Sequence, residues 1–151
     1  MKTEEAALIL VAAAAVILIL YFVTAKGAAK KLTIGNPDGS SIDVTVEIAN
    51  NTATRTKGLM GRKTLGEYEG MLFVFDSSAR HSFWMFNTTI PLDAIHISEN
   101  GTIVEVIEME PCGINCTSYV PQNESKYVLE VNRGFSKRHG IVAGKSRMTL
   151  P

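Results

Sequence analysis

Two patterns of hydrophobic and polar positions divide this chain near residue 25. From Ala6 to Ala25 no residue is charged and nearly all are apolar. At about 1.5 Å rise per residue, roughly 20 helical residues cross the ~30 Å hydrocarbon core of a bilayer, and a helix satisfies its own backbone hydrogen bonds there. The run predicts one transmembrane helix whose partner is the lipid bilayer. Residues 26–151 contain no second run of this kind.

Beyond residue 31, short apolar segments alternate with turn signals. Apolar residues occupy every second position between residues 42 and 48, which predicts a half-buried strand. Its inward residues are expected to be Ile42, Val44, Val46 and Ile48. Glu99-Asn100-Gly101 lies between two apolar segments and predicts a hairpin turn. The predicted strands cover residues 32–34, 42–48, 71–75, 82–86, 92–98, 103–109, 127–131 and 146–150.

Helical signals are few and brief. Thr52 or Thr54 is expected to cap a short helix that runs to about Gly61, and residues 135–139 are expected to form a helical turn. Many short strands with one or two short helices predict a mainly β fold, a single small β-sandwich or barrel-like domain. The aromatic rings of segment 82–86 are expected in its core.

The chain is therefore expected to have three parts: a membrane anchor over residues 1–25, a basic linker over 26–31 and a β domain over 32–151. A cleaved secretory signal is the alternative for the first part, because Val23-Thr24-Ala25 resembles a cleavage site. Signal peptides favour a basic start and an apolar stretch of about 7 to 15 residues, whereas this stretch is longer and Glu4 and Glu5 precede it. These features favour a retained anchor.

Two signals disagree about the side of the membrane that the domain occupies. Lys26, Lys30 and Lys31 follow the predicted span while Lys2 alone precedes it, which favours a cytoplasmic domain. Five of the eight asparagines lie in glycosylation acceptor triplets, which favours an extracytoplasmic domain. Such triplets also arise because Asn, Gly, Ser and Thr are common in turns. The candidate acceptors are Asn50, Asn87, Asn100, Asn115 and Asn123.

The two cysteines bear on the same question. Cys112 and Cys116 are close enough in sequence to form a small disulfide loop, which an oxidising compartment would preserve. Two free thiols are the second possibility. A zinc site with His96 or His139 is the third, although the second paired motif of a structural zinc site is missing. Together with the acceptor triplets, the disulfide interpretation favours an extracytoplasmic domain.

Charge and motif content exclude several classes of function. The chain has 15 Lys and Arg and 15 Asp and Glu, and these charges are intermixed, so no basic field for nucleic acid is present. We therefore expect no nucleic-acid partner. No phosphate loop, HExxH motif, calcium loop or nucleophile elbow is found, and we expect neither a metal nor a cofactor.

Several segments together resemble a known family. They are residues 55–62 (RTKGLMGR), 70–75 (GMLFVF), 83–88 (FWMFNT), 90–93 (IPLD), 127–130 (YVLE) and 140–144 (GIVAG). Their order and spacing are similar to the uncharacterised family catalogued as domain of unknown function 192. The resemblance implies a mainly β fold, often behind a signal or anchor, without an established activity. Phe86 stands where the family commonly has Lys, and Lys145 where an acid is usual, which weakens any polar site at those positions.

Six residues are candidates for a functional site because they are polar or aromatic within otherwise apolar segments. They are Arg55, Arg62, Trp84, Asn87, Asp93 and Glu130. A structural interpretation pairs the acids with the arginines and lets Asn87 bond to a nearby loop. A functional interpretation places the arginines, Trp84 and Asn87 around a small anionic or sugar-like ligand, since a guanidinium fork and an aromatic wall suit both.

Catalysis is a third interpretation of the same residues. Asp93 with His81 or His96 would form an acid and base pair in a small envelope-associated hydrolase. His96 alternates with Ile95 and Ile97, so its side chain is expected to face solvent. The interpretation that we favour is a membrane-anchored, extracytoplasmic β domain that binds a small ligand or a protein partner.

Overall fold

The computed structural model describes residues 12–13, 29–113 and 115–150. The predicted transmembrane helix lies outside this part of the chain, apart from residues 12 and 13, and so does the possible cleavage site. Within the described residues, no helix has the length and hydrophobicity that a membrane span requires. The first strand begins at Lys30, so it includes the last two residues of the predicted linker.

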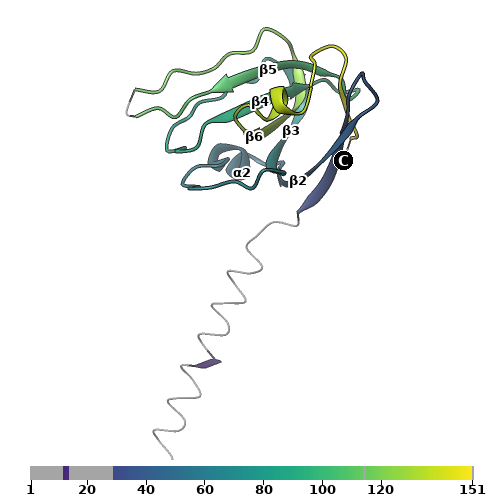
Figure 1. Ribbon diagram of the computed structural model, residues 1–151. Coiled ribbons are helices and arrows are strands. Elements are labelled where there is room, and N and C mark those ends of the chain that lie inside the picture. The colour runs from purple at the N-terminus through teal and green to yellow at the C-terminus, as the bar shows by residue number, and fades with distance from the viewer. Residues whose placement is uncertain (1–11, 14–28, 114, 151) are drawn as a thin grey trace, which may run out of the picture.

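The described residues form seven strands and two short helices (Figure 1). The strands are β1 Lys30–Gly35, β2 Ser41–Ala49, β3 Glu69–Ala79, β4 Leu92–Ile97, β5 Ile103–Met109, β6 Ser125–Asn132 and β7 Arg147–Met148. The helices are α2 Thr52–Lys57 and α3 Phe135–Arg138. All strands join one sheet in the order β5-β4-β6-β3-β2-β1-β7. The prediction of a mainly β, barrel-like fold is confirmed, whereas the β-sandwich alternative is wrong because the strands form one curled sheet.

The two edges of this sheet approach each other, which makes it a half-barrel. The N–H of Ile103, at the β5 edge, donates to the carbonyl of Ser146 at 3.0 Å. The N–H of Met148, at the β7 edge, donates to the carbonyl of Gly101 at 2.8 Å. Gly101 has a positive φ of 87° and closes the β4–β5 hairpin, as its sequence predicts. The curl encloses one face of the sheet.

Helix α2 connects β2 to β3, the parallel pair of this sheet. A parallel pair needs a crossover connection, and α2 lies within it. The side chain of Asn51 accepts the N–H of Thr54 at 3.0 Å, and the hydroxyl of Thr54 accepts the N–H of Asn51. The cap is therefore Asn51, and neither Thr52 nor Thr54, because Asn51 is the extended residue just before the first helical turn. The helix ends at Lys57, earlier than predicted.

Apolar side chains form two cores on opposite faces of the sheet. Along β6, Leu129 and Val131 belong to the first core, while Val128 belongs to the second. The first core includes Phe135 of α3, which is yellow in Figure 1. The second core includes Leu59, which follows α2, and Met85, from the loop between β3 and β4. Because both faces are covered, the central strands are buried on both sides.

The segment 82–86 is not a strand, which corrects the prediction. Phe83 alone pairs, through an isolated bridge to Tyr119, and Met85 packs in the second core. Trp84 and Phe86 are 50% and 46% exposed, so the expected burial of their rings is wrong. Successive residues of an extended segment point to opposite sides, and only one side of this segment has a core to pack against.

His96 is buried, contrary to the expectation that it faces solvent. Its face of β4 is covered by the second core, where Phe83 lies edge-on to the imidazole ring with centroids 6.0 Å apart. Its Nδ1 lies 3.0 Å from the hydroxyl of Ser125. Burial of this ring lowers the pKa of His96 to about 4.

Candidate functional site

A cleft opens on the outer face of the sheet, between α2 and the loop that carries Phe83 and Trp84. Its inner chamber has a volume of about 30 Å³ and reaches Glu130 of β6. Its outer bowl has a volume of about 260 Å³. The two hollows share five lining residues and therefore form one continuous cleft; these are Arg55, Thr56, Phe73, Phe83 and Trp84.

Glu130 is the residue that distinguishes this cleft. Its strand lies between β3 and β4, where its register partners are Met71 and Ala94, so its side chain points from the middle of the sheet into the second core. Only 4% of the residue is exposed. Among the described residues, none donates a hydrogen bond to its carboxyl group or forms an ion pair with it. Burial raises the pKa of Glu130 to about 8, so the group is mainly protonated at neutral pH.

Arg55 is held at the mouth of the cleft by α2. Its Nη1 donates to the backbone carbonyl of Val74 at 2.8 Å, and the guanidinium carbon lies 5.4 Å from the centroid of the Phe75 ring. The Asp76 carboxylate is 4.0 Å from Nη2 and its side chain is almost fully exposed, so this ion pair is weak. The guanidinium therefore keeps donor capacity for a ligand.

Aromatic rings form the walls. Phe73 of β3 and Phe83 meet edge to face, with ring centroids 5.0 Å apart. Trp84 stacks on Phe86 at a centroid distance of 5.3 Å, and both rings remain half-exposed at the mouth. Thr88 lies in the inner chamber and is buried. The arrangement combines a neutral acid, apolar walls and two cations, Arg55 and Lys57, which suits binding of a small molecule.

The structure brings together three of the six candidate residues, namely Arg55, Trp84 and Glu130. Arg62 instead forms an ion pair with Glu47, and both line a neighbouring hollow on the β2 side of the α2 segment, which meets the inner chamber at Lys57, Gly58 and Met60 but shares no residue with the outer bowl. Asn87 is exposed, with a left-handed φ of 52°, and its backbone carbonyl accepts the N–H of Gly61. Neither acid forms the predicted pair with an arginine.

Asp93 lies on the opposite face of the sheet from the cleft. Its two carboxylate oxygens accept the backbone N–H groups of Gly134 and Ser136, each at 2.9 Å. His96 shares its face of β4 with Leu92 and Ala94, members of the second core, and so points away from Asp93. His81 stacks on Phe75. The structure therefore does not form the acid and base pair that the hydrolase interpretation requires.

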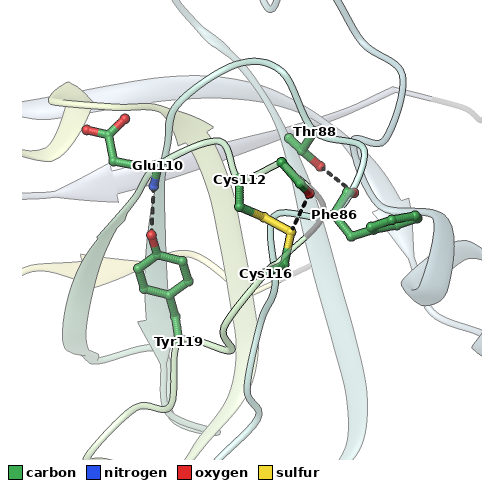
Figure 2. Close-up of a disulfide and its surroundings, with 7 residues drawn as sticks. Phe86, Thr88, Glu110, Cys112, Cys116 and Tyr119 are labelled. Atoms are coloured by element: carbon green, nitrogen blue, oxygen red, sulfur yellow. Dashed lines mark hydrogen bonds between the residues drawn. A yellow bond between two sulfur atoms is a disulfide. The ribbon is translucent and has the colours of Figure 1, made fainter.

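The predicted disulfide between Cys112 and Cys116 is present (Figure 2). It lies in the connection between β5 and β6, where the hydroxyl of Tyr119 accepts the N–H of Glu110 at 3.0 Å. The backbone of Tyr119 also exchanges two hydrogen bonds with Phe83, at 3.0 and 2.7 Å. The disulfide segment thus supports one wall of the cleft.

No metal centre is evident in the part of the chain that the structure describes, where His, Cys, Asp and Glu form no suitable group of three or more. Both cysteine sulfurs are used in the disulfide, so they do not act as zinc ligands in this state.

Comparison with known proteins places the chain in a family. The model of DUF192, described as Uncharacterized ACR, matches residues 33–148. The chain belongs to this family. The DUF192 match covers nearly all of the described domain and includes every cleft residue named above. A comparison with curated proteins finds no match.

Two solved structures are similar to this DUF192 domain. One is a protein from Sinorhizobium meliloti 1021 described as a "putative transcription regulator", with 32% sequence identity and a TM-score of 0.75 over 82% of this chain and 95% of that one. The other is a protein of unknown function from Novosphingobium aromaticivorans DSM 12444, with 29% identity and a TM-score of 0.73 over 81% of this chain and 85% of that one.

Sequence reasoning identified Trp84 as an aromatic wall residue but missed Phe73, Phe83 and the protonation state of Glu130. Phe73 and Phe83 belong to continuous apolar runs, which do not reveal the face on which a side chain lies. The only available signal for Glu130 was an acid embedded in an apolar strand. That signal was equally strong for Asp93, which proves to have two backbone donors.

Proposed function

We propose that this protein is a membrane-anchored, extracytoplasmic domain that binds a small anionic or sugar-like ligand in the cleft over Glu130. The observation that carries the binding proposal is the buried carboxyl group, which has no partner among the described residues. A ligand that hydrogen-bonds to this group displaces no protein partner, and a typical hydrogen bond of this kind contributes roughly 0.5–1.5 kcal/mol net. Arg55 and Trp84 at the mouth supply a charge and a stacking surface.

The extracytoplasmic placement rests on the apolar leader, the disulfide and the acceptor triplets. All five candidate asparagines are exposed, so glycosylation there would not disturb either core. Protease treatment of intact cells tests this placement. Digestion of the domain before lysis supports it, and digestion only after lysis contradicts it.

Ligand binding can be followed without a label, because Trp84 is the single tryptophan of the chain and lies at the cleft mouth. We expect a screen of small anions and sugars against the full-length protein in detergent to change its fluorescence and raise its unfolding temperature. Phe83→Ala, which removes a wall, should abolish the response. Arg62→Met, at a residue that lines the neighbouring hollow and not the cleft, is the matched control and should retain the response. A screen without any response, or a response that Phe83→Ala retains, would contradict the binding proposal.

Binding of a protein rather than a small molecule would appear as a stable complex that Trp84→Ala disrupts.

A further inference from the structure

The shape and charge of the cleft narrow the class of ligand, an inference that rests on the proposed binding function. The inner chamber has a volume of about 30 Å³. A cavity of roughly 10–15 Å³ on this measure holds one water molecule, so the chamber has room for about two water-sized groups. A carboxylate, with its two oxygens, fits this size. A whole sugar ring does not fit and must remain in the outer bowl.

Charge around the chamber favours an anionic group over an amine. Two cations, Arg55 and Lys57 from the α2 segment, line the chamber together with Glu130. The neighbouring strands place Met71 and Ala94 beside Glu130, and neither carries charge. His96 lies farther along the same face, and its lowered pKa keeps it neutral at pH 7. Because burial keeps Glu130 protonated, the charged side chains that line the chamber at neutral pH are Arg55 and Lys57, and this lining disfavours an ammonium group.

The outer bowl suits a ring that has an apolar face and polar edges. Trp84 and Phe75 present aromatic surface there, and hydroxyl groups come from Thr52, Thr56 and Ser82. Sugar rings have this combination, since their C–H groups form an apolar face and their hydroxyls point outward. The volume of about 260 Å³ is just below the roughly 300–1,000 Å³ usual for ligand pockets, so the bowl suits a small ligand.

We propose that the cleft binds a carboxylate-bearing sugar ring of the uronic acid type, with its carboxylate in the inner chamber that Arg55 and Glu130 both line and its ring against Trp84. Arg55 contributes a charge-assisted hydrogen bond, and protonated Glu130 donates its O–H to the second carboxylate oxygen. No group is transferred and no bond is broken. Selectivity for the acid arises because Glu130 is a donor only while it keeps its proton.

The test compares glucose with two derivatives, one with a carboxylate at C6 and one with an amine at C2, and uses Trp84 fluorescence of the full-length protein as the readout. The ligands are glucuronate, glucose and glucosamine. We expect saturable binding of glucuronate and at least tenfold weaker binding of the other two.

Glucuronate affinity should fall as the pH rises above 8, approaching tenfold per pH unit, because the donor is lost. Glu130→Gln keeps a donor that does not titrate, so its affinity should be independent of pH between 7 and 9.5. Arg55→Met should weaken binding more than tenfold, whereas Arg62→Met should leave it unchanged.

Several outcomes would overturn this inference. Equal affinity for glucose and glucuronate would remove the role of the carboxylate. Preferential binding of glucosamine, strengthening as the pH approaches 8, would identify an amine site that uses ionised Glu130. If none of the three binds while another compound from the screen does, the ligand class is wrong and the proposed binding function stands. If no compound binds, both proposals fail.

Discussion

Asp93 accepts the backbone N–H of Ser136 at 2.9 Å, and this bond joins β4 to the first turn of α3. The second oxygen of the same carboxylate accepts the N–H of Gly134 at 2.9 Å. Both groups lie at the start of α3, where helical N–H groups lack partners within the helix. Phe135, between these two amides, is fully buried in the first core. Asp93 therefore holds the helix that packs against the enclosed face of the sheet.

Asp93→Asn should destabilise the protein by roughly 2–3 kcal/mol, because the new amide group faces an N–H donor and leaves it unsatisfied. Urea denaturation measures this loss. Ser136→Ala is the matched control, since the Ser136 hydroxyl is buried without a hydrogen bond partner among the described residues and its removal should cost little. Ligand binding in the cleft should survive Asp93→Asn below the unfolding transition. A variant that keeps its stability but loses binding would instead place Asp93 in the functional site.

Sequence pattern predicted most of the strands but fewer of the site residues, and the difference has a physical origin. The alternation between residues 42 and 48 predicted the buried positions of β2 well, because the outward residues of that strand are largely exposed. All six residues of β4 are buried, so its sequence gave no sign that Asp93 and His96 lie on opposite faces. Face assignment there depends on α3 and the Phe83 loop, which pack from distant parts of the chain.

The sequence predicted some of the cleft residues but not how the chain arranges them in space. Arg55, Trp84 and Glu130 were recognised as unusual side chains in apolar segments, and they do line one cleft. Their separation from Arg62 was not predictable, because seven residues place two side chains on one face only if the helix continues. Helix α2 ends at Lys57, and Gly58 then adopts a positive φ of 47°, which turns the chain away.

His96 should destabilise the protein in acid. Its pKa is about 4 in the folded state, below the 6.5 of an unperturbed histidine, because burial disfavours the charged ring. As the pH drops, His96 is therefore protonated in the unfolded chain before it is protonated in the folded protein. The unfolding free energy should fall between pH 6.5 and pH 4, by at most about 1.4 kcal/mol per pH unit. Unfolding free energies of the wild type and His96→Gln, measured between pH 7 and 4.5, should converge as the pH falls. Titration of the His96 ring protons near pH 6.5, followed by NMR, would contradict this expectation.

Removal of the disulfide should affect both stability and the cleft. The loop-entropy model gives about 2 kcal/mol for so short a loop, so Cys112→Ser with Cys116→Ser should lower the unfolding free energy by roughly that amount. The wall residue Phe83 is bonded to Tyr119 in the same connection, so the fluorescence of Trp84 should also shift. Reduction of the unmodified protein by dithiothreitol is the control for the substitutions themselves. A fluorescence spectrum that neither treatment changes would show that the cleft wall is independent of the disulfide.

Glu130 should give the protein an opposite pH dependence, one that needs no ligand. Its pKa of about 8 in the folded state lies above the reference value of 4.5, so the native protein keeps a proton that the unfolded chain releases. Stability should therefore fall as the pH rises from 4.5 to 8, at up to about 1.4 kcal/mol per pH unit, and level off above 8.

Glu130→Gln removes this titration while it preserves the shape of the side chain. The unfolding free energy of the variant should equal that of the wild type near pH 4.5 and exceed it by roughly 3–5 kcal/mol near pH 8. Glu124→Gln, at an exposed position, is the matched control and should follow the wild type across the range. Parallel curves for the wild type and Glu130→Gln would mean that Glu130 is already ionised in the folded protein. The cleft would then lack the neutral donor on which recognition of a carboxylate depends.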